Sequence, residues 1–126
     1  MFLLLIVTLF IPIVEYNHIG CFKTDSGPLI PSLEGTDPLL DGDYTTRVDV
    51  FKKCLNAARR EDNTVFAIKN GGECLSSSGN LTDVIAKYAP SNMCDNNKGG
   101  LNAMDFYFVI GESIPTFSEF PDLNFL

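Results

Sequence analysis

The residues whose chemistry this sequence constrains most are its four cysteines: Cys21, Cys54, Cys74 and Cys94. No two of them form a Cys-x-x-Cys pair, so zinc binding and thioredoxin-like redox chemistry have little support. We expect two structural disulfides instead, for which four cysteines allow three pairings. A Cys54–Cys74 bond would join a predicted helix to a predicted hairpin, and it would leave Cys21 to bond Cys94.

His18 is the single histidine, and any Cys-His or Ser-His nucleophilic site would have to use it. No nucleophile-elbow signature accompanies it, so we expect a partly exposed strand histidine. Asp41-Gly42-Asp43 lacks the other ligands of an EF-hand loop and is typical of a turn. The two Gly-Gly pairs do not open helices as phosphate-binding loops do. The sequence therefore predicts no catalytic residue, no metal site and no cofactor.

Aromatic rings are the remaining candidates for ligand contact, because an amphipathic ring can stack on the apolar face of a sugar. The chain has no tryptophan, so tyrosines and phenylalanines would have to serve. We take Tyr44, Tyr88 and Tyr107 as candidate ligand-binding residues, with Phe106 as a neighbouring platform. The competing interpretation is that these rings belong to the core.

The first fourteen residues, MFLLLIVTLFIPIV, are almost entirely apolar. This run is short for a bilayer crossing and is typical of the apolar core of a signal peptide, although no basic residue precedes it and no small-x-small cleavage site follows. We expect a signal peptide or apolar leader over residues 1–15 and no stable membrane span. The alternative is a buried strand of a chain whose true start lies elsewhere.

Three further features favour a secreted, extracellular protein. An even number of cysteines suits an oxidising compartment. Asn80-Leu81-Thr82 is an N-glycosylation sequon, so Asn80 is a predicted glycosylation site. The net charge of −7 makes nonspecific binding to nucleic acid or to anionic membranes unfavourable.

One amphipathic helix is the clearest predicted element. Thr46 and Asp49 form a capping-box-like start, with aspartate in place of glutamate. Behind them, Val48, Phe51 and Leu55 repeat at helical spacing and should face the core.

Short strands surround this helix in the sequence. Residues 64–69, TVFAIK, are a β-branched and aromatic run with the apolar residues 65–68 at its centre, and they predict a central strand buried on both faces. Asn70-Gly71 favours a two-residue hairpin turn that leads into a returning strand at residues 73–75. The other expected elements are a strand over 15–22, a loop held to the core over 23–43, one or two helical turns over 81–88, and a last strand over 105–110. The fold class is therefore α+β, with one main helix on a short antiparallel sheet.

Several short motifs occur together in this order: Gly20-Cys21-Phe22, the helix bearing Cys54, Phe66-Ala67-Ile68, Asn70-Gly71-Gly72-Glu73-Cys74, Tyr88-Ala89-Pro90-Ser91, Cys94 and Gly99-Gly100. This arrangement resembles the reduced-cysteine WSC-like extracellular domains, which are related in style to the apple/PAN fold. The resemblance implies a disulfide-stapled α+β domain over residues 16–110, followed by a tail or linker over 111–126. It also implies a carbohydrate-binding module.

We therefore expect a secreted, non-catalytic recognition module that binds glycans or extracellular glycoproteins. The alternative is a structural extracellular-matrix protein, or a venom or effector protein, that contacts a protein partner. Pull-down of partners from extracellular material, with and without enzymatic deglycosylation, would distinguish the two. Deglycosylation should abolish capture by a glycan-binding module and leave capture of a protein partner unchanged.

Overall fold

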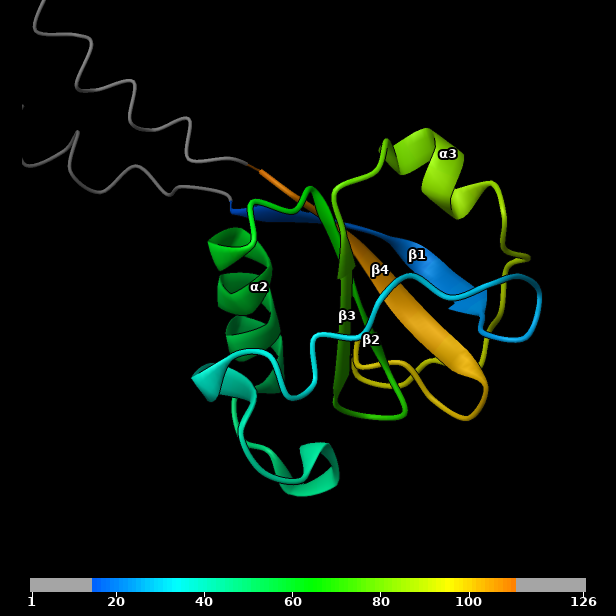
Figure 1. Ribbon diagram of the computed structural model, residues 1–126. Helices are drawn as coiled ribbons and strands as arrows, with labels where there is room; N and C mark the ends of the chain where they lie inside the picture. Colours follow the sequence, from blue (N-terminus) through cyan, green and yellow to red (C-terminus); the bar gives the residue numbers. More distant parts are fainter. Residues whose placement is uncertain (1–14, 111–126) are drawn as a thin grey trace, which may run out of the picture.

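The structure is a computed structural model that describes residues 15–110. Four strands form one antiparallel sheet in the order β1-β4-β2-β3 (Figure 1). Their bounds are β1 Tyr16–Lys23, β2 Val65–Lys69, β3 Glu73–Ser77 and β4 Ala103–Val109. The small α+β fold is confirmed. The predicted leader, apart from Glu15, and the predicted tail over 111–126 lie outside the described residues.

Helix α2, Val50–Arg60, covers one face of the sheet (Figure 1). Its buried side chains come from one stripe, and they meet Phe66 and Ile68 of β2 and Tyr107 of β4 in one apolar cluster. The predicted central strand is confirmed, because β2 pairs with both β3 and β4 and its four residues from Val65 to Ile68 are fully buried.

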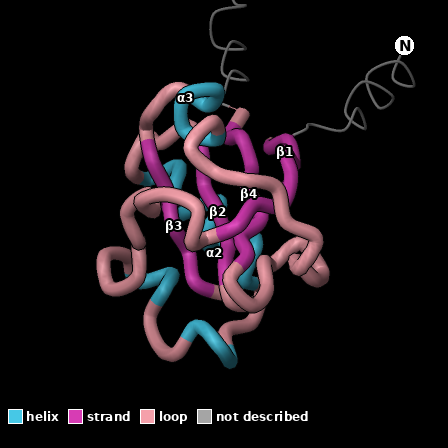
Figure 2. Tube along the Cα trace, turned by 90° about the vertical axis from the view of Figure 1, so that its right-hand side faces the viewer, coloured by secondary structure: helices cyan, strands magenta, loops and turns pink. Residues whose placement is uncertain are grey.

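The opposite face of the sheet is covered by the short helix α3, Leu81–Ile85, and by part of the long loop after β1. Val84 and Tyr88 from the α3 region and Ile30 from the loop pack on Val65 and Phe106. Figure 2 shows α3 at one end of the sheet, with the loop crossing in front of the strands. The expectation that this loop is held to the core is confirmed.

The start of α2 differs from the predicted capping box. Thr46 belongs to a separate 3-10 turn, η2 (Tyr44–Thr46), which Asp43 caps by accepting a hydrogen bond from the Thr45 amide. Asp49 precedes the helix in the left-handed conformation with φ of 53°, and its side chain makes no capping bond. Val48 consequently lies outside the helix and is 67% exposed, so its predicted place on the inner stripe is wrong.

The hairpin between β2 and β3 has a three-residue loop rather than the predicted two-residue one, because Lys69 pairs with Glu73. Asn70 and Gly71 do adopt the positive φ angles that the sequence predicts, 52° and 84°. The third residue, Gly72, lies against the Tyr44 carbonyl, and a Cβ there would come within 2.2 Å of that oxygen. The third loop residue therefore packs closely against η2, where a side chain would not fit.

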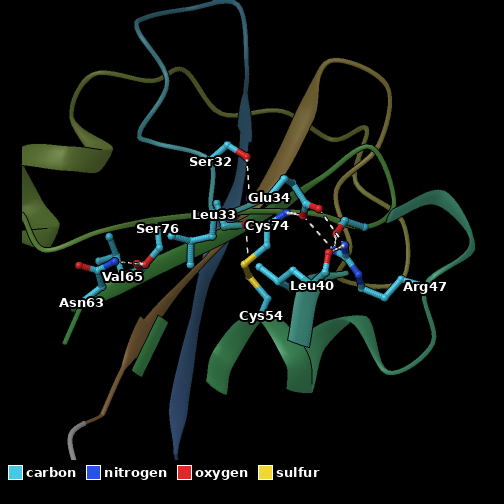
Figure 3. The surroundings of a disulfide bond; sticks show 12 residues. Ser32, Leu33, Glu34, Leu40, Arg47, Cys54, Asn63, Val65, Cys74 and Ser76 are labelled. Carbon is cyan, nitrogen blue, oxygen red and sulfur yellow. Dashed lines mark hydrogen bonds and ion pairs between the residues drawn. A yellow bond between two sulfur atoms is a disulfide. The ribbon is translucent and has the colours of Figure 1, made fainter. Parts of the chain in front are cut away.

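The Cys54–Cys74 disulfide joins α2 to β3, and neither cysteine is exposed (Figure 3). Beside it, Arg47 donates hydrogen bonds to both carboxylate oxygens of Glu34 and to the Leu40 carbonyl. Glu34 also accepts a hydrogen bond from the Cys74 amide. The loop, the helix start and the returning strand are thus tied together around one covalent bond.

Two further features complete the framework. The Cys21–Cys94 disulfide is also formed, so both predicted pairings are present, and it links β1 to the loop that precedes β4. The 3-10 turn η1, Pro38–Leu40, packs Leu40 against the α2 side of the core. Among the residues that the structure describes, no helix has the length and apolar character needed to cross a bilayer.

Candidate functional site

A small cavity of about 270 Å³ opens where β1, the first turn of α2 and the loop before β4 meet. We call it the aromatic pocket. Its lining residues come from three separate segments: Tyr16, His18 and Tyr107 of the sheet, Phe51 of α2, and Asn96, Asn97 and Lys98 of the loop. The volume is slightly below the range of about 300–1,000 Å³ usual for drug-sized ligands, so it suits one sugar ring or one side chain.

Four rings line this pocket, those of Tyr16, His18, Phe51 and Tyr107, and they support one another. Tyr16 packs edge-on against Phe51, with ring centroids 4.5 Å apart, and lies 5.9 Å from Tyr107. Behind them, Tyr107 stacks on the buried Phe66 with ring planes only 13° apart. Tyr16 is 39% exposed, whereas Tyr107 is only 1% exposed. The His18 side chain is 41% exposed, so the pocket has two accessible rings, those of Tyr16 and His18, over a rigid aromatic base.

The Tyr107 hydroxyl holds the neighbouring loop in place by donating a hydrogen bond to the Asn97 carbonyl. Burial raises the pKa of Tyr107 well above its usual range, and the nearby carboxylate of Asp105 and the Tyr16 hydroxyl add to this effect. The phenol therefore stays protonated at physiological pH and remains a donor. This bond fixes the backbone between Asn96 and Lys98 against the sheet.

A second anchor for the same loop is the buried carboxylate of Asp105, which is 1% exposed. One oxygen lies 2.7 Å from His18 Nε2, and the other accepts a hydrogen bond from the Gly99 amide at 2.8 Å. Gly99 has φ of 76°, and a Cβ there would come within 2.3 Å of the Ile68 carbonyl. Only glycine fits this position, so the end of the loop is fixed by backbone packing as well as by Asp105.

The loop also separates the aromatic pocket from a wider hollow of about 520 Å³. Asn96 and Lys98 line both, and Asn70, Gly71 and Leu101 line only the wider one. Asn96 and Asn97 of this loop hold positive φ angles, and their amide side chains are exposed. Amide groups beside aromatic rings can donate and accept hydrogen bonds with hydroxyl-rich ligands.

The three tyrosines that the sequence suggested as ligand contacts lie in three different places. Tyr107 forms the base of the aromatic pocket. Tyr88 is 6% exposed, packs on Phe106 and donates a hydrogen bond to the Pro28 carbonyl, so it has the position of a core residue. Tyr44 is partly exposed in η2 and does not line the pocket.

Tyr16, Phe51 and the loop residues 96–98 were not recognised as site residues from the sequence. Tyr16 and His18 are two positions apart on one strand, so they share a face, and this periodicity was the signal that could have identified them. Phe51 was predicted only as a core residue. Its contact with Tyr16 depends on how α2 crosses the sheet.

The possible nucleophiles and metal ligands also have defined places. All four cysteines are in disulfides, so Cys21 offers no thiol to His18. Cys21, Cys94 and Asp105 do lie close enough to share an ion, but the two sulfurs are bonded to each other and are not thiolates. Asn80 lies exposed at the start of α3, where its side-chain oxygen caps the helix.

The sequence matches no protein-family model and no curated protein. The WSC-like resemblance therefore stays a prediction.

Proposed function

We propose that this protein is a secreted, non-catalytic recognition module that binds a saccharide of a glycan or glycoprotein in the aromatic pocket. The observation that carries the proposal is the combination of an accessible Tyr16 ring on a rigid aromatic base with the amide side chains of Asn96 and Asn97. The ring offers a stacking surface for the apolar face of a sugar, and the amides can bond its hydroxyls.

The pocket geometry also favours a shallow, weak site. The cavity is small, and only the rings of Tyr16 and His18 have substantial exposure, so a single terminal sugar would make most of the contact. Small contact areas give modest affinities, since binding must first offset lost translational and rotational freedom. Binding to multivalent glycans would then be stronger than binding to single sugars.

Two disulfides with no free cysteine among the described residues support an extracellular location, because such bonds persist in oxidising compartments. The exposed Asn80 side chain agrees with use of the sequon, since its oxygen caps α3 while its nitrogen is left for modification. Secretion and glycosylation are both part of this proposal.

A glycan array probed with the full chain tests the proposal, and Tyr16→Ala is the matched pocket variant. Tyr44→Ala is the control, because it removes the same ring from a partly exposed position outside the pocket. We expect Tyr16→Ala to abolish binding and Tyr44→Ala to leave it unchanged. Absence of binding to any glycan at high density would overturn the proposal, and loss with Tyr44→Ala alone would move the site to η2.

A further inference from the structure

The outer edge of β1 is open over its first half, and this edge borders the aromatic pocket. In the second half of the strand, the Lys23 amide donates to the Ala89 carbonyl and the Ser91 amide donates to the Cys21 carbonyl. The other sheet edge, β3, is covered in the same way, because the Leu33 amide donates to Cys74. Among the described residues, nothing pairs with the outer side of residues 16–19.

The direction of the free backbone groups follows from the pairing of β1 with β4. The Val109 amide donates to Thr64, so Val109 bonds toward β2 and makes no ladder bond with its β1 partner, Tyr16. By alternation, Asn17 bonds to Phe108, and the amide and carbonyl groups of Tyr16 and His18 face outward. A bulge follows His18, after which Cys21 and Lys23 also face outward, in agreement with their bonds to the covering segment.

The side chains of Tyr16 and His18 lie on the same face of β1 and both line the pocket. A strand added along this edge would place every second side chain on that face, and one of them would reach the cavity. This is the arrangement of β-augmentation sites, in which main-chain bonds supply affinity and a pocket for alternate side chains supplies selectivity. The volume of about 270 Å³ matches one apolar or aromatic side chain.

We propose that residues 16–19 of β1 bind an extended, basic segment of a partner polypeptide as an added antiparallel strand, with one apolar side chain in the aromatic pocket. The net charge of −7 favours a basic partner. A second copy of this chain fits the edge less well, because it carries the same negative charge. This inference rests on the backbone edge and does not depend on saccharide binding.

The probe is a nine-residue peptide of alternating lysine and threonine with one central phenylalanine, titrated into the full chain and followed by amide NMR. We expect shifts and slowed hydrogen exchange at the amides of Tyr16 and His18. Methylating the peptide amides that face β1 should abolish binding, whereas methylating the outward-facing set should not. Both peptides act on the unmodified protein, so no folding defect can imitate the result.

A matched pair of protein variants gives a second test. His18→Ala and His18→Pro both remove the ring and its contact with Asp105, but only the proline also removes the outward amide. Proline is tolerated at such edge positions, and His18→Pro should bind the peptide about tenfold more weakly than His18→Ala. The two variants should bind saccharide equally, because neither retains the imidazole.

Three results would overturn the inference. The first is no perturbation at Tyr16 or His18 with about 1 mM peptide, a concentration that detects even millimolar binding. The second is equal peptide binding by the two His18 variants. The third is a dimer in sedimentation with the β1 amides already protected, which would assign the edge to a second copy.

Discussion

The guanidinium of Arg47 and the carboxylate of Glu34 form a two-point ion pair, with Nη2–Oε1 at 2.7 Å and Nη1–Oε2 at 2.9 Å. The Arg47 side chain is 2% exposed, and its two terminal nitrogens also donate hydrogen bonds to the carbonyls of Leu40 and Gly72. One side chain thus links the long loop, η1 and the β2–β3 hairpin beside the Cys54–Cys74 bond (Figure 3).

Replacing Arg47 by methionine should destabilise the fold strongly. The variant removes the charge partner of Glu34 and a donor to two carbonyls, leaving Glu34 only the Cys74 amide, and breaking a buried ion pair in this way costs about 3–5 kcal/mol. Arg60→Met is the control, because the Arg60 side chain is 57% exposed and its ion pair with Asp37 is longer, at 3.4 Å. That control should lose about 1 kcal/mol or less. Equal losses of unfolding free energy in the two variants, measured by urea denaturation, would contradict the role assigned to Arg47.

The same ion pair predicts how stability depends on pH. Burial alone would raise the pKa of Glu34, but hydrogen bonds from Arg47 and the Cys74 amide, with the charge of Arg47, outweigh it and hold the pKa below its ordinary value of 4.5. The unfolded chain therefore binds more protons than the native one as the pH falls below that value. The stabilisation is fully present above pH 4.5 and is lost as the pH falls through the lowered pKa.

In Glu34→Gln, the unfolding temperature should fall less steeply than in the unmodified protein as the pH is lowered from neutral to strongly acidic values. Asp43→Asn is the comparison, because hydrogen bonds from the Thr45 amide and hydroxyl also lower the pKa of Asp43. Asp43 is fully exposed, so Asp43→Asn should change the pH dependence of the unfolding temperature less than Glu34→Gln does. A pH profile of Glu34→Gln that matches the unmodified protein would show that the pair does not titrate with folding.

Much of the framework could be predicted from local patterns. The apolar run of β2 and the positive-φ preference of Asn-Gly act over a few residues, and the structure keeps both. The start of α2 could not be predicted, because Asp43 caps η2 and competes with the apparent capping box at Thr46. Short capping motifs are degenerate, and the motif at Thr46 alone does not show that η2 ends before α2 begins.

The aromatic pocket was beyond prediction from the sequence for a different reason. Its residues come from three segments, and their meeting depends on the β1–β4 register, the bulge after His18 and the Cys21–Cys94 bond. Residue type alone could not separate Tyr16, which is accessible, from Tyr88, which is buried. The exposure of a ring is set by what packs on it, and that is a property of the whole fold.

The two disulfides should respond differently to mild reduction. Cys54 and Cys74 are both fully buried, whereas Cys21 and Cys94 are partly exposed, so a thiolate reaches the second pair first. Graded dithiothreitol, followed by alkylation and peptide mass mapping, should label Cys21 and Cys94 before the buried pair. Loss of Cys21–Cys94 should then free the loop and weaken saccharide binding. Simultaneous labelling of all four would mean that reduction requires global unfolding.

The final prediction separates the two roles of Asn80, which accepts hydrogen bonds from the amides of Thr82 and Asp83 at the start of α3. Asn80→Ala should remove both the cap and the glycan, at a cost of about 1 kcal/mol from the lost cap. Thr82→Ala keeps the cap, since only its backbone amide takes part, but it destroys the sequon. Its secreted product should lose the glycan mass while the hydrogen bonds at α3 stay intact.

Intact mass of the secreted product and thermal unfolding after enzymatic deglycosylation read out the two roles independently. Deglycosylated Thr82→Ala and the deglycosylated unmodified protein should unfold together, and Asn80→Ala should unfold at a lower temperature. A product mass that Thr82→Ala changes only by the mass difference between threonine and alanine would show that Asn80 carries no glycan. Equal unfolding of all three proteins would show that the cap contributes nothing to the fold, since α3 would then be held by Val84 and its apolar contacts alone.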